Sequence, residues 1–372
     1  MVDCDRWFAV AASHLAPTLV APDACSALEQ RCRALPGDLL TALEVRLHGA
    51  ASSAVDVAWR IESAEHARRC ALRCDDPHLQ RTLTRWARDV SSASSLAPTP
   101  STAVRLWLEQ DAPHPAPRRD PAPLRPIVCA ETPSLLSDRR LHETLLPSLA
   151  GHALTRAQRR TLTRLRAAMR PFGPLLYAFS LRARCDDAGP NAAYPVRLEF
   201  LGAQPARAVD GLRAGGAALC AMAARLDALL TAAIELHPPF LAIDLPPRRH
   251  HLAFDVDADG GLAPHIGLET SLRAGATVHS ASWRSLFDGL VEAGVADPVR
   301  AAAVLAWPGV DSPATAPQRW PARTADDRAS GPVPGTCIRV LSHVKRVHRD
   351  GQAPFAKVYL LFRYRPPQRQ PR

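Results

Sequence analysis

Ten strand-like segments, most of which alternate apolar and polar side chains, occur in this sequence, and their grouping into five pairs most constrains how the chain can fold. Such alternation is typical of a β-strand with one buried and one polar face. The paired segments are residues 43–48 and 55–61, 104–111 and 126–131, 176–184 and 196–201, 251–257 and 265–270, and 338–348 and 356–364. Turn-forming runs such as Asp259-Gly260-Gly261 and Asp350-Gly351 separate the members of a pair. We therefore predict five β-hairpins.

Between the pairs the apolar residues recur at the spacing of a helix face. The predicted helices cover residues 3–16, 23–34, 77–90, 156–170, 208–236, 282–293 and 297–307. Helical sequence thus precedes or follows each hairpin, which indicates an internal architectural repeat. We expect one domain over residues 1–372, with N-terminal helices in 1–40, a long Pro-rich connection over 312–335 and a disordered basic tail at 366–372.

The ten segments present two chemically different faces. One face is apolar and too large to leave in water, so helices must cover it. The other mixes charged, histidine and aromatic side chains: Glu44, Arg46, His48, Asp56, Arg60, Arg105, Trp107, Glu109, Arg182, Arg197, Glu199, His251, Asp255, His265, Glu269, Arg339, His343, Lys345, Lys357, Tyr359 and Arg363. This pattern predicts an α+β fold in which five αββ repeats form a closed ten-strand antiparallel barrel around a polar interior, with the helices outside. An open sheet with one solvated face is the alternative.

The formal net charge of +10 favours an anionic partner. Of the 46 Lys and Arg residues, only Lys345 and Lys357 are lysines. In a chain that otherwise uses arginine throughout, two lysines close together indicate sites that need a compact ammonium group. The alternative is that both are ordinary exposed lysines.

The remaining composition describes a globular protein without a membrane span. The most apolar predicted helix has its longest uncharged stretch at residues 214–224, well short of the roughly 20 residues that cross a bilayer. No basic-then-apolar run begins the chain, so we expect no signal peptide and a cytoplasmic location. The nine scattered cysteines, with no Cys-x-x-Cys pair, predict reduced thiols.

Two strand motifs carry a resemblance to a known family. Lys357-Val358-Tyr359 is similar to the Lys-x-Tyr strands with which indole-prenylating enzymes hold a diphosphate, and Leu43-Glu44-Val45 followed by Arg60 is similar to their Glu base and diphosphate-binding Arg. With the repeated helix–hairpin order, the chain resembles the ABBA family of soluble aromatic prenyltransferases. It departs from that family in having one Lys-x-Tyr, with Arg105-Leu106-Trp107 and Arg197-Leu198-Glu199 as loose counterparts, and only four tyrosines.

The resemblance implies transfer of an allylic prenyl group from its diphosphate to an aromatic acceptor, either a small natural product or an aromatic residue of a peptide. Cations in a water-poor site would stabilise the leaving diphosphate, aromatic faces would shield the allylic cation, and a carboxylate would take the acceptor's proton. The candidate bases are Glu44 and Glu109, either of which could instead be the structural partner of an arginine. The shielding candidates are Trp107 and Tyr359. The diphosphate candidates are Arg60, Arg105, Arg182, Arg197, Arg339, Lys345, Lys357 and Tyr359.

For partners we expect the prenyl diphosphate and the acceptor only, with no membrane and no nucleic acid, and a monomeric protein. No cofactor is required in this hypothesis, and Mg²⁺ is an optional one. Asp255-x-Asp257-x-Asp259-Gly260 begins like a calcium loop, but Ile266 stands at the twelfth position, where an EF-hand needs Glu. A divalent ion there is a secondary hypothesis, and no side-chain set for a bound metal is predicted.

Two rival functions remain open from the sequence. A pentein-like enzyme would use Cys337 as nucleophile and His343 as base. A non-enzymatic binder of nucleic acid would use the net charge and the basic tail at 363–372, although aromatic residues make up only 5% of the chain and fall mostly on the apolar face. Phosphate-cradling Gly-rich loops, Gly-x-Ser-x-Gly and His-Glu-x-x-His are absent from the sequence, which excludes kinase, α/β-hydrolase and zincin interpretations.

Overall fold

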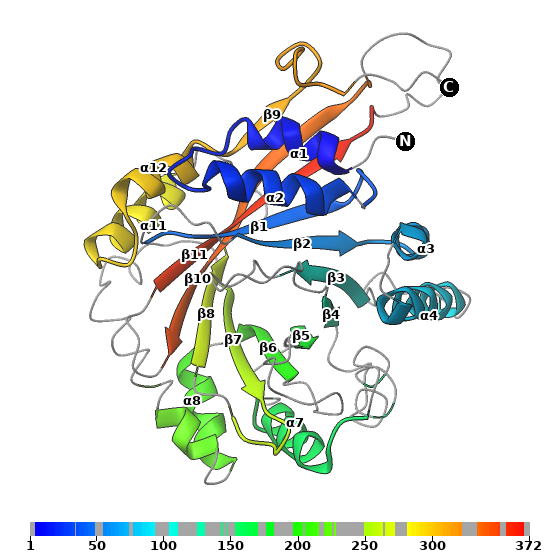
Figure 1. Ribbon diagram of the computed structural model, residues 1–372. Helices are drawn as coiled ribbons and strands as arrows, with labels where there is room; N and C mark the ends of the chain where they lie inside the picture. Colours follow the sequence, from blue (N-terminus) through cyan, green and yellow to red (C-terminus); the bar gives the residue numbers. More distant parts are fainter. Residues whose placement is uncertain are drawn as a thin grey trace.

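The computed structural model describes residues 4–33, 35–48, 55–73, 77–93, 104–110, 125–130, 143, 147, 153–169, 176–181, 196–203, 205–215, 219–224, 227, 249–262, 265–271, 281–321, 333–349 and 355–367. One antiparallel sheet lies at the centre, with the helices outside it (Figure 1). Its strands are β1 (Leu40–Arg46), β2 (Asp56–Ile61), β3 (Val104–Gln110), β4 (Arg125–Ala130), β5 (Leu176–Leu181), β6 (Val196–Ala203), β7 (Arg249–Val256), β8 (His265–Ser271), β9 (Gly309–Asp311), β10 (Thr336–Arg349) and β11 (Phe355–Arg365).

The strands pair antiparallel in an almost sequential order. Each strand from β1 to β7 pairs with the next along the chain. β11 pairs with β1, and β10 pairs with β8, β9 and β11. The sheet has eleven strands in the order β11-β1-β2-β3-β4-β5-β6-β7-β8-β10-β9, with the additional β10–β11 pairing. All ten predicted segments are confirmed as strands, and β9 is an unpredicted eleventh.

The prediction of a closed ten-strand barrel made of five αββ repeats is wrong as stated. The sheet has eleven strands, and its members are unequal, because β10 is 14 residues long and β9 only three. Helices and strand pairs do alternate five times, but the described units differ: three of them carry two helices, and the last contributes three strands. Over the described residues the fold is therefore α+β, with an eleven-stranded antiparallel sheet.

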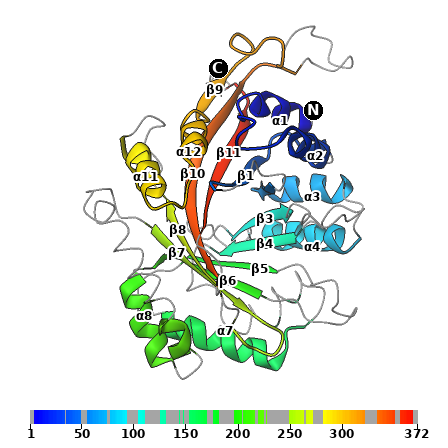
Figure 2. The same ribbon diagram turned by 60° about the vertical axis from the view of Figure 1, so that its left-hand side comes forward.

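The helices lie around the outside of the strands in both views (Figures 1 and 2). They are α1 (Cys4–Ala12), α2 (Pro22–Arg33), α3 (Ala64–Arg73), α4 (Pro77–Ala93), α7 (Arg156–Met169), α8 (Pro205–Ala214), α11 (Ala281–Glu292) and α12 (Pro298–Leu305). α1 packs on β10 and β11, α3 on β2, and α7 on β6 and β7. Each predicted helix corresponds to one of these, and α3 was not predicted. The predicted helix 208–236 corresponds to α8, which ends at Ala214, and to the described residues 219–224 and 227, which are again helical.

The helices cover the apolar face of the sheet, as the alternation predicts. The buried side chains of that face include Leu43, Val45, Val57, Trp59, Leu106, Leu108, Val196, Leu198, Phe254, Val358, Leu360 and Phe362. Paired neighbours such as Leu43 and Leu360 come from adjacent strands, so burial of this face joins distant parts of the chain. Burial of each such side chain contributes roughly 1.5–3 kcal/mol, which makes this face the main source of stability.

A β-bulge in β10 exchanges the two faces of that strand. Leu341 pairs with Leu360, whereas Val344 pairs with Val358, so β10 advances three residues where β11 advances two. The extra residue reverses the alternation. Odd-numbered residues before the bulge, such as Arg339, therefore share the helix-covered face with Leu360, while odd-numbered residues after it, such as Lys345, lie on the opposite face.

Helix α7 is fixed at the end of β7 by its own N-terminal capping residues. The Thr155 hydroxyl accepts a hydrogen bond from the Gln158 amide (3.0 Å), and Gln158 Oε1 accepts one from the Thr155 amide (3.1 Å), which is a capping box. Thr155 Oγ1 also donates to the carbonyl of Ala258 (2.6 Å) in the turn after β7. In that turn Gly260 has φ +82°, and a Cβ there would lie 2.8 Å from the backbone of Ala157, so the turn requires glycine.

The C-terminal end of β1 is held by α12. Asp297 caps α12 by accepting hydrogen bonds from the amides of Val299 and Arg300. The Asp297 amide donates to the Leu47 carbonyl (2.7 Å), and Arg300 Nη1 donates to the Arg46 carbonyl (2.6 Å). These contacts position the strand end that carries the polar residues described next.

Candidate functional site

Most predicted site residues lie on the face of the sheet opposite the helices, across five neighbouring strands. The strand register arranges them in rows. Lys345 lies opposite Lys357, which lies opposite Arg46. Tyr359 lies opposite Glu44 in the next row. Rows on one face are about 7 Å apart, so a small substrate could contact two or three of them.

Glu44 is the centre of this arrangement. Its carboxylate accepts hydrogen bonds from Lys357 Nζ on one oxygen and from the Tyr359 hydroxyl on the other. Lys357 Nζ is also 3.8 Å from a carboxylate oxygen of Asp56. Asp56 belongs to β2 and lies opposite Glu44 of β1. Burial raises the pKa of Glu44, but the Lys357 charge and the hydrogen bonds from Lys357 and Tyr359 outweigh it, so the pKa falls to about 2. Glu44 is therefore ionised at neutral pH.

Tyr359 connects this carboxylate to an imidazole. The rings of Tyr359 and His343 stack, with centroids 3.9 Å apart and planes inclined by 22°. The Ser342 hydroxyl lies 3.0 Å from His343 Nδ1. Both sides of the Tyr359 side chain are thus occupied, with its ring against His343 and its hydroxyl on Glu44. The sequence pointed to Tyr359 and His343 separately, and the bulge brings them together.

Lys345 is the more deeply buried of the two lysines, with a relative exposure of only 4%. It lies directly opposite Lys357 across the β10–β11 pair. Two ammonium groups opposite each other repel unless anions lie near them. Glu44 supplies one such anion for Lys357, and Glu269 lies opposite Lys345 on β8. The interpretation of these lysines as ordinary exposed residues is wrong for Lys345.

The face becomes apolar one row further along. Val340 lies opposite Leu361, Leu361 opposite Ala42, and Ala42 opposite Ala58. Ala42 is buried and the other three are half-buried. A strip of small and aliphatic side chains thus crosses four strands beside Glu44 and Tyr359. We did not predict it, although the same alternation contains its signal.

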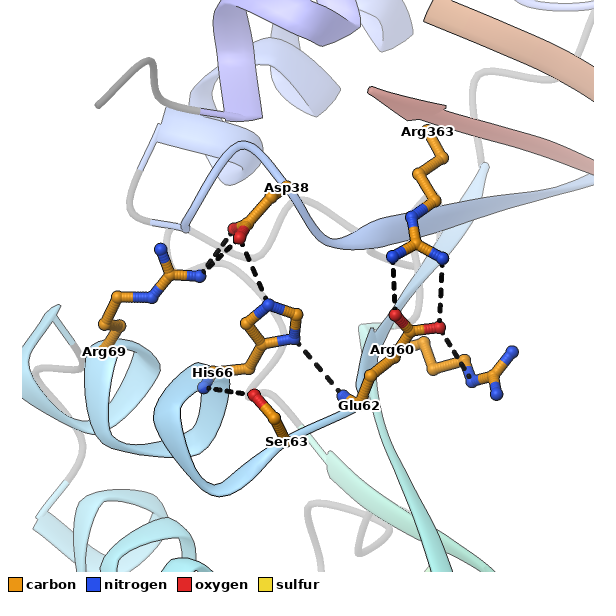
Figure 3. Close-up of polar contacts among 7 residues, drawn as sticks. All are labelled: Asp38, Arg60, Glu62, Ser63, His66, Arg69 and Arg363. Atoms are coloured by element: carbon orange, nitrogen blue, oxygen red, sulfur yellow. Dashed lines mark hydrogen bonds and ion pairs between the residues drawn. The ribbon is translucent and has the colours of Figure 1, made fainter. Parts of the chain in front are cut away.

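Arg60, Trp107 and Glu109 lie on the same face, across β2 and β3. Arg60 lies opposite Trp107, and Glu109 lies opposite Ala58. Arg60 Nε is 3.5 Å from Glu62, and Glu62 also accepts a 2.7 Å bond from Arg363 (Figure 3). Arg60 thus shares a carboxylate with a second arginine, which reduces the net positive charge that it offers to a substrate.

Arg197 lies on the predicted face but is paired with a neighbouring strand. Its Nε and Nη2 donate to the two carboxylate oxygens of Asp255 at 2.6 and 2.9 Å. Both side chains are buried, and the two residues are opposite each other on β6 and β7. A buried bidentate pair of this kind is a structural contact, so we no longer count Arg197 among the diphosphate ligands.

Arg339 must also be removed from the site, because the bulge places it under the helices. It is 4% exposed, its Nε donates to Asp311 at 2.9 Å, and its Nη1 donates to the Trp307 carbonyl. His14 Nε2 lies 3.0 Å from the other oxygen of Asp311. The prediction that Arg339 faces the polar side assumed an uninterrupted strand and is wrong.

The bulge separates the two residues of the pentein-like alternative as well. Cys337 is fully buried on the helix-covered face, and burial together with the charge of Asp311 raises the pKa of its thiol to about 12. His343 stacks on Tyr359 on the opposite face. The structure does not bring this thiol and this imidazole together.

Two of the predicted diphosphate residues lie wholly or partly outside the described residues. Arg182 lies outside the described residues, and so does the side chain of Arg105, whose backbone belongs to β3. Within the described part, no group of three or more His, Cys, Asp or Glu side chains is arranged to hold a metal ion. In the aspartate turn, burial and the neighbouring Asp259 and Asp255 charges raise the pKa of Asp257.

A second polar cluster, which we did not predict, joins α3 to the segment before β1 (Figure 3). His66 Nδ1 accepts a bond from the Glu62 amide (3.4 Å), so its Nε2 donates to Asp38 (3.2 Å). Arg69 donates to both oxygens of Asp38 at 2.6 and 2.8 Å. Burial raises the pKa of Asp38, but His66 and Arg69 lower it to about 2. Every partner here is internal, so we assign the cluster a structural role.

Comparison of the sequence with known protein families finds no matching family, and comparison with curated proteins finds no match. None of the helices in the described ranges combines the length and the apolar character that a membrane crossing requires. Function must therefore be argued from the geometry.

Proposed function

We propose that this protein transfers an allylic prenyl group from a prenyl diphosphate to an aromatic acceptor. The observation that carries the proposal is the order of rows on one face of the sheet. Two buried or half-buried lysines come first, then the ionised Glu44 with Tyr359, then an apolar strip. A prenyl diphosphate has the matching order of parts: an anionic head, an allylic carbon and an apolar tail.

The head would lie against Lys345 and Lys357. When the bond between the allylic carbon and the diphosphate oxygen breaks, its electron pair leaves with the diphosphate, whose negative charge grows. Preorganised ammonium groups in a poorly hydrated site stabilise that charge more than they stabilise the bound substrate.

The allylic carbon would then lie beside Tyr359, with the tail over Ala42, Ala58, Val340 and Leu361. The electron-rich face of Tyr359 attracts a carbocation, and the stacked His343 ring limits the movement of the tyrosine. Trp107, beside Arg60, supplies a second aromatic face. The aliphatic strip excludes water that would otherwise capture the cation.

Glu44 would take the proton in the last step. A ring carbon of the acceptor supplies the electron pair for the new carbon–carbon bond, and the same ring carbon then loses its proton to a carboxylate oxygen of Glu44. A carboxylate with a pKa of about 2 is a weak base, but it suffices, because a protonated aromatic ring is a much stronger acid. Glu109 is the alternative base on β3, in the same row as the apolar strip and opposite Ala58.

The direct experiment incubates the protein with dimethylallyl or geranyl diphosphate and a panel of indoles, phenols and aromatic peptides. Parallel reactions contain Mg²⁺ or a chelator, and alkylated products are detected by mass spectrometry. We expect product from the parent protein and a decrease of about 100-fold or more in Lys357→Ala, comparable to the loss of one charge-stabilising donor in an active site.

Binding of a non-hydrolysable thiolodiphosphate analogue separates the outcomes. No product from any acceptor, together with no binding of the analogue, would overturn the proposal. Equal product from the parent and Lys357→Ala would remove only the role of Lys357. The matched variant Lys357→Arg keeps the charge, so retained binding with lost product would show that the compact ammonium matters.

A further inference from the structure

Helix α7 carries a row of exposed arginines that pair with no acidic residue in the described part of the chain. Arg156, Arg159, Arg160 and Arg164 are all exposed, and α7 contains no Asp or Glu. No ion pair joins any of the four to an acidic residue of the described chain. The neighbouring helix α8 differs, because its Arg213 bonds Asp227 at 2.7 Å and lies 3.5 Å from Asp210.

The four arginines form one continuous surface, because residues three and four apart lie on the same side of a helix. Arg156, Arg160 and Arg164 follow one another at about 6 Å intervals, and Arg159 lies beside them, so the row is about 12 Å long. Leu162 and Leu165 on the other side of α7 are buried. The helix is therefore firmly packed, and its basic side faces away from the core.

The row begins at the same end of the sheet as the two lysines. α7 starts against the turn that follows β7. Because alternate strands of an antiparallel sheet run in the same direction, β7 and β10 end at the same edge, and Lys345 lies near the end of β10. Through Glu269, Lys345 is in register with His251, so it lies five residues inward from the end of β7 at Val256.

We propose that the α7 arginine row is a docking surface for an acidic polypeptide segment. Alternate side chains of an extended peptide are about 6.6–6.8 Å apart, close to the spacing of the arginines, and guanidinium groups bind carboxylates with two parallel hydrogen bonds. The α7 sequence contains no aromatic residue for stacking on bases. A row of about 12 Å also reaches few phosphates, so a peptide fits this surface better than nucleic acid does.

This inference goes beyond prenyl transfer and does not depend on it, because it concerns binding alone. The test measures fluorescence anisotropy of a labelled ten-residue peptide of alternating Glu and Ser at low salt. The α7 variant is Arg160→Gln/Arg164→Gln. A matched control exists in α4, where residues 81–85 repeat the same Arg-Thr-Leu-Thr-Arg sequence as residues 160–164, so Arg81→Gln/Arg85→Gln removes the same charge from the same local sequence.

We expect the α7 variant to weaken peptide binding about tenfold, as for the loss of two exposed ion pairs, and the α4 control to weaken it less than twofold. Thermal unfolding of both variants shows whether each is folded. Equal weakening by the two variants would overturn the proposal, since binding would then follow net charge. Absence of peptide binding to the parent, or tighter binding of a 20-base-pair DNA duplex than of the peptide, would also overturn it.

Discussion

Two buried basic residues on β10 lie only six positions apart and illustrate opposite uses of a charge. Arg339 lies under the helices, where Asp311 and the Trp307 carbonyl satisfy it. Lys345 lies on the other face, opposite a second lysine. The first arrangement is satisfied on the helix-covered face, whereas Lys345 lies between Lys357 on β11 and Glu269 on β8, one row from the ionised Glu44. The difference indicates that burial alone does not mark a functional cation, and that the two residues are distinguished by the face of the sheet on which each lies.

Arg339→Ala tests the structural half of this comparison and has the largest expected effect. It leaves the Asp311 carboxylate buried without its main partner, so we expect a loss of about 3–5 kcal/mol in the free energy of unfolding, measured by urea denaturation. Binding of the thiolodiphosphate analogue by the folded fraction should be unchanged. Weakened binding by a protein that remains fully folded would contradict the assignment of Arg339 to a structural role.

Acid titration tests the Glu44 cluster. The pKa of Glu44 falls from 4.5 to about 2 on folding, so its ionised form stabilises the protein above pH 4.5, and that stability is lost as the pH falls from 4.5 toward 2. The contribution is about 3 kcal/mol. Glu44→Gln should flatten the dependence of unfolding free energy on pH in this window. If the unfolding free energy of Glu44→Gln changed with pH as steeply as that of the parent, Lys357 would not be lowering the pKa of Glu44.

Tyr359→Phe separates the hydroxyl of the tyrosine from its ring. It removes the hydrogen bond to Glu44 but keeps the stack on His343, so we expect a loss of about 1.5–3 kcal/mol in stability, as for a bond to a charged group. The pKa of Glu44 should rise, which shifts the acid-unfolding curve to higher pH. An unchanged curve would show that Lys357 alone lowers the pKa of Glu44.

Arg363→Ala has the smallest expected effect on stability. Arg363 and Glu62 form an ion pair in which the arginine side chain is 35% exposed, and exposed pairs of this kind contribute about 0–1 kcal/mol. We expect a change in thermal unfolding near the limit of detection. A loss comparable to that of Arg339→Ala would mean that burial is not what distinguishes the two arginines.

Local periodicity was sufficient to predict the strands but not the placement of every side chain. The ten strand segments follow from alternation and from their pairing around loops, and Glu44, Lys345, Lys357 and Tyr359 share a face as predicted. β9 was missed because three residues cannot show a period. α3 was missed because its buried side is made of small residues, Ala67, Cys70 and Ala71, which give a weak apolar signal.

The partners of the charged residues could not be predicted either, because they come from distant parts of the chain. Asp311 meets Arg339 only because the short β9 adds to β10. Lys357 meets Glu44 across a separation of 313 positions. The bulge has no sequence signature that we recognise in Ser342-His343, and without it Arg339 and Lys345, both odd-numbered, are expected on the same face.

The bulge also makes the length of β10 as important as its composition. Deleting a single residue near Ser342 would restore uninterrupted pairing between β10 and β11. The part of β10 before the deletion would then turn its two faces over. Arg339 and Cys337 would then point away from the helices, and Ile338 and Val340 would take their places. A one-codon loss here would thus disrupt the fold more severely than most replacements of the same residues, and natural variation of this segment should preserve its length before its side chains.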